Sequence, residues 1–375
     1  MTRFTPKLLP EGLRDRLPDE AEAASRVTRA LIDVMSSHGY RRIAPPIAEF
    51  RETLAGDAAD PASRDLLRFT DPVSRRTLAI RPDMTRQIGR IAGSRLATAP
   101  RPLRLSYAGQ VVKLTATTLW PDREMMQIGA ELIGSDSVAA VTEVLRVAVE
   151  ALTAAGVTGI TVDLTLPDLV DTLAAGVFPL ADDQISAVKA ELDAKDAGAL
   201  AALGATDYLP LIAATGPFAE ALPKLQAIDA GGVLAGRIAA LHNIAASIGT
   251  SATVTLDPTE RHGFEYQSWI GFSIFVAGHA TTIGRGGSYA ITHPDGSVEE
   301  AVGFSLYPDP LIGAGLGKNS QAQTILYLPT NHDSKQAAIL RSQGWTTIAA
   351  LSDDNEPLAL GCTHTLNEDG TAQPL

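Results

Sequence analysis

The chain has 375 residues, of which 45% are hydrophobic and 20% are charged, and its formal net charge at pH 7 is -12. This composition is typical of a globular protein with a large core. It excludes a disordered or fibrous chain and argues against a broad basic face for nucleic acid. A single cysteine, with no apolar run of about 18 residues and no signal-peptide core, predicts a cytoplasmic protein without a membrane partner.

The first part of the chain predicts helices that alternate with strands. A helix is expected to begin at Pro18, because proline fits the first turn, and to end at Gly39. A strand over residues 42–47 is interrupted by Pro45 and Pro46, which places it at a sheet edge or an interface. The other elements expected here are a hairpin over 67–81, helices over 84–96 and 137–156, an antiparallel strand pair over 103–112 and 124–133, and a strand over 160–166.

The second part of the chain differs in composition. Alanine-rich sequence between about residues 167 and 250 predicts a helical insertion. A glycine-rich linker over 311–323 is expected to lead into a β-α-β unit. Runs of strands with helices at their edges predict an α+β fold on an antiparallel sheet, with one domain over 1–310 and a small C-terminal α/β domain over 324–375. The strands expected after the insertion lie over 252–256, 266–276, 279–284 and 298–305.

The sequence R-E-M-M-Q-I-G-A-E-L-I-G, residues 123–134, predicts a strand with an unusual second face. The even-numbered residues over 126–132 are apolar and form a core face, whereas Gln127, Gly129 and Glu131 share the other face. That second face could be exposed to solvent, as in many antiparallel sheets. We favour ligand contact, because glycine weakens a strand unless another group must approach closely.

The sequence A-I-R-P-D-M-T-R places Arg81, Asp83 and Thr85 where a strand passes through a proline into a helix. Asp83 could be an ordinary helix cap. A carboxylate and a hydroxyl at such a switch could equally bind an ammonium group. The residues alone leave both interpretations open.

Two further motifs carry glycine or charge. G-R-G-G-S-Y, residues 284–289, contains a G-x-G but follows strands rather than opening a helix, so it does not predict a dinucleotide site. Its glycines indicate close approach of a ligand or another strand. R-H-G-F-E-Y, residues 261–266, could be a loop of solvated charge. The seven histidines lack metal-type spacing and there is no cysteine cluster, so neither a metal nor a cofactor is predicted.

The order of these motifs resembles the catalytic core of histidyl-tRNA synthetase, a class II aminoacyl-tRNA synthetase. It is most similar to the histidyl-tRNA-synthetase-like regulatory subunits of ATP phosphoribosyltransferase. This resemblance implies a class II synthetase-like antiparallel sheet flanked by helices. It covers about residues 8–306 and rests on L-P-E-G-L-R-D, A-I-R-P-D-M-T, R-E-M-M-Q-I-G-A-E-L-I-G, G-F-E-Y, G-R-G-G-S-Y and A-V-G-F-S.

The resemblance also implies a pocket for free histidine. Carboxylates with hydroxyl and amide donors can surround an ammonium and an imidazole through charge-assisted hydrogen bonds. His262 and Gln267 stand where the synthetase has an arginine and a second tyrosine, which leaves open whether histidine still binds. The positions that match its histidine-binding residues are Asp83, Thr85, Gln127, Glu131 and Tyr266. The further residues expected in this pocket are Arg81, Lys113, His262 and Tyr289.

The residues that handle phosphate in the synthetase are changed here. Its ATP-clamping arginine and glutamate correspond to V-K-L-T, residues 112–115, and lysine lacks the planar fork of arginine. Its late arginine motif corresponds to G-F-S-L-Y-P-D-P from Gly303, which has no arginine, and its G-G-R-Y-D has become G-G-S-Y-A. We therefore expect no catalytic residues and no adenylate formation, because the charge of the transition state would not be stabilised.

The resemblance thus implies a non-catalytic regulatory subunit. It would bind the short catalytic form of ATP phosphoribosyltransferase and would carry the site at which L-histidine inhibits. A homodimer within a hetero-oligomer is expected, with Pro45 and Pro46 at the dimer contact. Three alternatives remain open: a divergent histidyl-tRNA synthetase or amino-acid-activating ligase, a stand-alone amino-acid sensor, and a scaffold with an emptied pocket.

Overall fold

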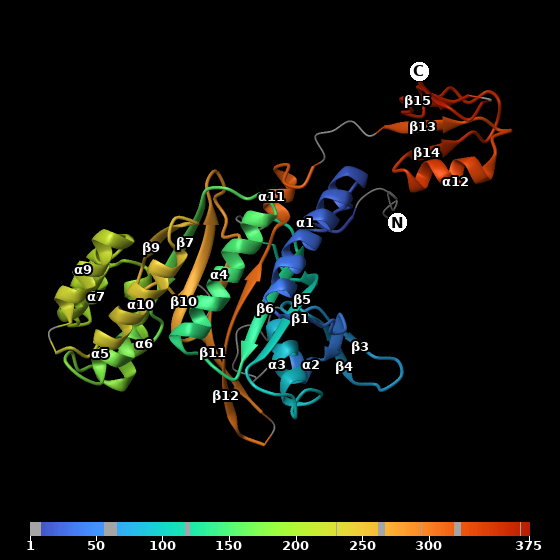
Figure 1. Ribbon diagram of the computed structural model, residues 1–375. Helices are drawn as coiled ribbons and strands as arrows, with labels where there is room; N and C mark the ends of the chain where they lie inside the picture. Colours follow the sequence, from blue (N-terminus) through green and yellow to red (C-terminus); the bar gives the residue numbers. More distant parts are fainter. Residues whose placement is uncertain are drawn as a thin grey trace, which may run out of the picture. The chain divides into compact units, whose positions relative to one another are not determined.

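The computed structural model describes residues 9–55, 66–116, 121–229, 231–261, 267–293, 295–318, 324–367 and 369–375. The chain divides into two units, Met1–Lys318 and Asn319–Leu375. Figure 1 shows the course of the chain through both. Among the helices that the structure describes, none combines the length and the hydrophobicity needed to span a lipid bilayer.

A mixed sheet forms the centre of the first unit. Strands β1 and β5 are parallel, as are β7 and β9, and the other neighbours run antiparallel. The antiparallel pairing predicted for residues 103–112 and 124–133 is confirmed. Within the described ranges the sheet has nine strands, in the order β1 (Arg41–Arg42), β5 (Leu103–Val112), β6 (Glu124–Ile133), β12 (Val298–Leu306), β11 (Gly284–Thr292), β10 (Gln267–Val276), β7 (Ile160–Thr165), β9 (Thr253–Leu256) and β8 (Gly216–Pro217).

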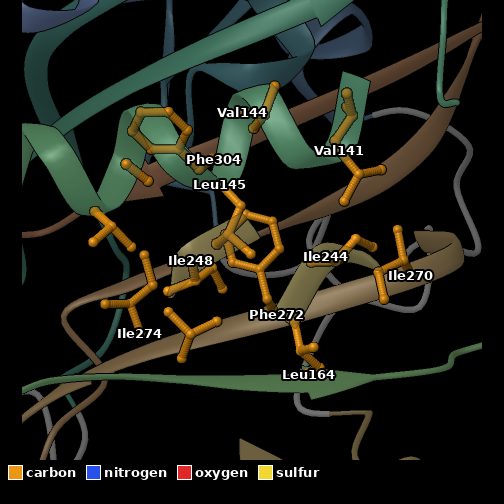
Figure 2. Close-up of a cluster of buried hydrophobic side chains, with 14 of the residues drawn as sticks. Val141, Val144, Leu145, Leu164, Ile244, Ile248, Ile270, Phe272, Ile274 and Phe304 are labelled. Carbon is orange, nitrogen blue, oxygen red and sulfur yellow. The ribbon is translucent and has the colours of Figure 1, made fainter. Parts of the chain in front are cut away.

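Helices α1 (Pro18–Ser37), α4 (Val138–Ala154) and α10 (Ala235–Ile248) contribute to a single apolar core with one face of this sheet, which we call the core face. Helix α1 begins with proline at its first turn, as predicted, and the Ser137 hydroxyl accepts a hydrogen bond from the Ala140 amide (3.3 Å) at the start of α4. Figure 2 shows Leu145 of α4 and Ile244 of α10 beside Phe272 of the sheet.

The opposite face of the sheet, which we call the site face, is covered differently. Helix α3 (Thr85–Gly93) packs Met84 and Ile88 against Leu105, Tyr107 and Met125 of β5 and β6. The alanine-rich stretch forms helices as predicted, beyond the β7 and β9 strands (Figure 1). These insertion helices are α5 (Leu169–Ala174), α6 (Asp182–Asp193), α7 (Ala197–Ala202), α8 (Leu209–Ala213) and α9 (Phe218–Ile228), followed by α10.

The predicted hairpin is confirmed as part of a small second sheet in this unit. Its strands lie in the order β2 (Ala48–Phe50), β4 (Thr77–Ile80) and β3 (Arg68–Thr70), beside the short helix α2 (Arg51–Ala55). The strand expected over 42–47 is much shorter than predicted, because the prolines end it. Only β1 pairs, at the edge of the large sheet.

Two other predicted elements are wrong. No strand covers 279–284; residues 277–283 turn the chain between β10 and β11, and the Ile283 amide donates to the Ile274 carbonyl (2.8 Å). G-R-G-G-S-Y is therefore the first half of β11, and its glycines gave no alternating pattern by which to recognise it. The predicted start of the linker at residue 311 is too early, because helix α11 (Asp309–Gly313) covers this position and buries Leu311 and Ile312.

The second unit has a four-stranded sheet within its described residues. Strands β13 (Ile325–Leu328) and β14 (Thr346–Ala349) are parallel and are joined by α12 (Ser334–Ser342), which is the β-α-β unit predicted. The order is β14, β13, β15 (His364–Leu366) and β16 (Ala372–Pro374). Its core is formed by Leu326, Leu328, Ala337, Leu340 and Leu366.

Candidate functional site

The polar side chains of β6 are buried on the site face. Gln127 is 0% exposed and Glu131 is 1% exposed. The interpretation of this face as solvent-exposed is therefore wrong. A buried acid requires hydrogen-bond partners, and it has them here.

Two tyrosines hold the Glu131 carboxyl. The Tyr107 hydroxyl donates to its Oε1 (3.0 Å), and the Tyr289 hydroxyl donates to its Oε2 (2.8 Å). Burial raises the pKa of Glu131 to about 8, although both tyrosine hydrogen bonds act in the opposite direction. Glu131 is therefore a fixed acid that is mostly protonated at neutral pH while no cation lies beside it.

The glycine between Gln127 and Glu131 makes room for one of these tyrosines. A Cβ atom on Gly129 would lie 2.4 Å from the Tyr107 hydroxyl and 2.3 Å from the Phe304 carbonyl oxygen. On the neighbouring strand, a Cβ on Gly303 would lie 1.6 Å from Glu131 Oε2. Both glycines are thus required for the acid and its partners to fit on the sheet.

Asp83 is held at the end of this network by β6 and by the start of α3. Its Oδ1 accepts from the Thr85 amide (2.7 Å), and its Oδ2 accepts from Gln127 Nε2 (2.6 Å). The N-cap residue of α3 is Met84, so Asp83 is not the helix cap. The same Gln127 nitrogen donates to Ser305 Oγ (2.8 Å), and Gln127 Oε1 accepts from the Met84 amide (2.9 Å). Gln127 therefore positions Asp83 and does not itself line the cavity described next.

A cavity opens above β6, β12 and β11, which we call the first cavity. It spans about 330 Å³ of space, part of which is open solvent at its mouth. Of the residues expected at the site, it brings together Asp83, Thr85, Glu131 and Tyr289. Its other lining residues are Gln267, Arg285, Gly286, Gly287, Gly303, Phe304, Ser305 and Tyr307.

Arg285 is the charged residue of this cavity that the sequence did not reveal. It lies on β11 in register with Ser273 on one side and Ser305 on the other. Burial raises the pKa of the Tyr307 phenol, the charge of Asp83 raises it further, and the charge of Arg285 lowers it. Asp83 and Arg285 thus place a carboxylate and a guanidinium in the lining of one cavity. These groups can pair with the ammonium and the carboxylate of a zwitterion.

Some expected residues lie elsewhere. Arg81 is buried outside the cavity, where its guanidinium donates to the Gln110 carbonyl (2.8 Å) and the Pro45 carbonyl (2.9 Å), so it ties backbone segments together. Lys113 is exposed after the end of β5 and does not line the cavity. His262 and Tyr266 lie outside the described residues.

A metal centre is not found within the described ranges. No group of three or more His, Cys, Asp or Glu side chains there is arranged to hold a metal ion. Among its described lining residues, the first cavity presents two carboxyl groups, one guanidinium and several hydroxyls. These groups can bind a charged ligand that forms hydrogen bonds.

Comparison with known proteins gives a consistent result. A family model described as histidyl-tRNA synthetase matches residues 12–311. The ATP phosphoribosyltransferase regulatory subunit of Paramagnetospirillum magneticum is 39% identical over 98% of this chain and 97% of that protein. The protein of the same name from Rhodospirillum centenum is also 39% identical, over 95% of this chain and 94% of that protein.

A solved structure confirms the fold. The crystal structure of an ATP phosphoribosyltransferase regulatory subunit/histidyl-tRNA synthetase from Bacillus halodurans superposes with a TM-score of 0.82. The alignment covers 96% of this chain and 97% of that one at 22% identity. The predicted class II synthetase-like α+β fold is therefore confirmed.

Proposed function

Because the chain belongs to the family of ATP phosphoribosyltransferase regulatory subunits, we propose that its first cavity binds free L-histidine and that bound histidine inhibits a separate catalytic subunit. As a member of this family, the chain is a non-catalytic subunit of the enzyme and belongs to histidine biosynthesis. The proposal assigns the ligand, its site and the consequence of binding.

The arrangement of charge in the first cavity supports an amino acid as ligand. Asp83 is fixed by Gln127 and the Thr85 amide with its carboxylate on the cavity wall, where it would accept from the α-ammonium group. Arg285 would bind the α-carboxylate, since a guanidinium matches a carboxylate in two parallel hydrogen bonds. This pairing carries the proposal, because it matches the two charges that every free amino acid has.

The buried Glu131 carboxyl supports a side chain with hydrogen-bonding nitrogen atoms. Its two tyrosine partners leave it in a fixed position on the cavity floor. An imidazole nitrogen could donate to it, and an imidazolium would pair with the ionised form. Because the pKa of Glu131 is about 8 in the empty site, binding a cation beside it would release a proton.

The position of Lys113 supports regulation rather than amino-acid activation. The resemblance places this lysine where the synthetase clamps ATP with an arginine, yet here it is exposed and outside the first cavity. Among the described residues that line the first cavity, Arg285 supplies one guanidinium, whereas a transferring phosphate is stabilised by several cations. Histidine would then inhibit by binding the inactive arrangement of a complex more tightly than the active one.

We also propose a homodimer within a hetero-oligomer that contains the short catalytic subunit, in the cytoplasm. The backbone carbonyls of Pro45 and Pro46 are held by Arg81 and Gln87, which gives this segment a fixed shape. Beside it Ile47 is 51% exposed, and Phe69 on β3, at the other edge of the small sheet, is 44% exposed. An exposed apolar side chain next to a rigid proline segment supports the dimer contact expected there.

Reconstitution tests this function. A short-form ATP phosphoribosyltransferase catalytic subunit is assayed alone, with this chain, and with this chain plus histidine. We expect activity to rise with the chain and to fall with histidine only when the chain is present. Catalytic activity that does not change when the chain is added would contradict the partnership. Histidine-dependent ATP–pyrophosphate exchange by the isolated chain would favour a synthetase instead.

A further inference from the structure

A second cavity lies on the site face, where strands β7 and β10 meet the insertion helices. It spans about 640 Å³ of space, part of which is open solvent at its mouth. Strands β7 and β10 are paired there through Asp163 and Ser273, and Ser273 is in turn paired with Arg285 of β11. The lining residues are Thr165, Pro167, Asp168, Asp171, Lys189, Glu260, Arg261, Gln267, Ser268, Phe272 and Ser273.

Two carboxylates that line the second cavity already have a cation beside them. Asp171 of α5 is bonded to the Lys189 ammonium of α6, and this ion pair joins two helices of the insertion. Asp168 Oδ2 accepts from the Arg237 guanidinium of α10 (2.5 Å). Both carboxylates are therefore neutralised within the chain, so a cationic ligand would have to displace a cation that the fold itself supplies.

The third acid of the cavity, Glu260, shares a hydrogen bond with Asp163 of β7. Burial raises the pKa of Glu260, and burial raises the pKa of Asp163 to about 7. Two carboxyl groups can share a hydrogen bond only when one of them holds a proton, so the pair carries about one negative charge at neutral pH. The charge of Arg285 lowers the pKa of Glu260, so this acid also has a cation nearby.

Two donors of the second cavity, by contrast, lack an acceptor among the residues that the structure describes. The Arg261 amide donates to Asp193 Oδ1 (2.8 Å), but the Arg261 guanidinium makes no hydrogen bond or ion pair there. Ser273 is 8% exposed, and its hydroxyl has no partner in the described ranges. An ammonium has three donor protons, of which Lys189 uses one on Asp171. Donors that face a cavity without acceptors suit an anionic ligand.

We propose that the second cavity binds a small organic phosphate, whose phosphate group is held by Arg261 and Lys189. A phosphate monoester carries negative charge on oxygens that only accept, which matches a guanidinium and an ammonium that only donate. The Thr165 and Ser268 hydroxyls donate within the chain, so their oxygens can accept from the hydroxyl groups of a sugar, and Ser273 can donate to one. This inference goes beyond the proposed function, because none of these residues lines the first cavity.

Isothermal titration calorimetry on the full chain, with ribose 5-phosphate as the probe, tests this inference. We expect saturable binding of one molecule per chain. Ribose lacks the phosphate and inorganic phosphate lacks the sugar hydroxyls, so each should bind at least about tenfold more weakly. No saturable binding of ribose 5-phosphate, or binding of inorganic phosphate as tight as that of ribose 5-phosphate, overturns the inference.

Substitutions locate the bound phosphate. Arg261→Met should weaken binding of ribose 5-phosphate by about tenfold or more, because a charge-assisted hydrogen bond is lost. Arg261→Lys keeps the charge and should recover part of this loss. Ser273→Ala should weaken binding by about threefold or more. Arg146→Met is a matched control, since Arg146 is an exposed arginine of α4 that does not line the cavity.

Thermal unfolding of each variant establishes that it is folded. In Arg261→Met, histidine affinity should stay within about threefold of wild type, because Arg261 does not line the first cavity. An unchanged affinity for ribose 5-phosphate in Arg261→Met, or an equal loss in Arg146→Met, overturns the inference. Failure of the wild type to bind histidine contradicts the proposed function instead, so the two failures are distinct.

Discussion

The two faces of the nine-stranded sheet differ although the same strands form both. On the core face, Ile128 of β6 and Phe304 of β12 pack with α4 and α10, as Figure 2 shows for Phe304 beside Val144 and Leu145. On the site face of β6, Gln127 lies one position before Ile128 and Glu131 three positions after it. Both are just as deeply buried but lie among hydroxyls and glycines.

This difference separates stability from recognition within single strands. Burying an aliphatic side chain on the core face stabilises the fold, whereas burying Glu131 on the site face costs stability when the acid ionises. The core face in turn keeps the strands rigid enough to hold carboxylates at fixed positions, which is what a selective site requires. Substitutions on the two faces should therefore change different properties.

The largest effect on stability is expected on the core face. Ile128→Ala removes an aliphatic side chain that is 0% exposed and should lower the free energy of unfolding by about 2–5 kcal/mol. Urea unfolding measures this change. Histidine affinity of the folded variant should stay within about threefold of wild type, and a loss of binding without loss of stability would contradict the separation of the faces.

Glu131→Gln should change how stability depends on pH. The pKa of Glu131 is raised from 4.5 to about 8 in the folded chain, so its contribution is fully present below pH 4.5 and is lost as pH rises through about 8. At pH 9 the neutral amide should therefore make the variant more stable than wild type by up to about 5 kcal/mol. Unfolding curves at pH 5 and pH 9 test this, and a variant less stable than wild type at both values would refute it.

Arg285→Met should lower affinity for histidine by about 1.5–3 kcal/mol, because a charged hydrogen bond to the ligand carboxylate is lost. Histamine, which lacks that carboxylate, should bind the variant and wild type equally. Arg104→Met is a matched control, since Arg104 pairs with Glu143 away from the cavity and should leave both ligands unaffected. Equal losses for histidine and histamine would show that Arg285 does not hold the carboxylate.

The smallest effect is expected at Lys113. Lys113→Ala should change histidine affinity by less than about 0.5 kcal/mol, because the side chain is exposed and does not line the first cavity. The same calorimetric titration measures it. A loss comparable with that of Arg285→Met would place the lysine in the site after all.

The period-two alternation of residues 124–133 was enough to predict β6 and its polar face. The strand-proline-helix sequence was enough to place Asp83 at the junction between a strand and a helix. The resemblance added the idea that both contact one ligand. The pairing of Tyr107 and Tyr289 with Glu131 could not be predicted, because it depends on the register of strands far apart in the chain.

Arg285 was missed for a related reason. Three glycines surround it within residues 284–287, so no alternation marked a strand. The motif was predicted to follow strands, whereas it forms the first half of β11 in the middle of the sheet. Arg81 was placed in the pocket because it neighbours Asp83 in sequence. On a strand-like segment, however, the direction of a side chain depends on its partners, and Arg81 is turned toward the backbone carbonyls of Gln110 and Pro45.

Titration calorimetry of L-histidine into the isolated chain and into Glu131→Ala tests the central claim most directly. We predict saturable binding to the wild type at one histidine per chain. The variant should lose about 2–5 kcal/mol of binding free energy, because the imidazolium of the ligand would lie in a desolvated cavity without the carboxylate that pairs with it. Glu143→Gln, on the core side of the sheet, should bind like wild type. No heat of binding to the wild type, or equal affinity in Glu131→Ala, would contradict the account.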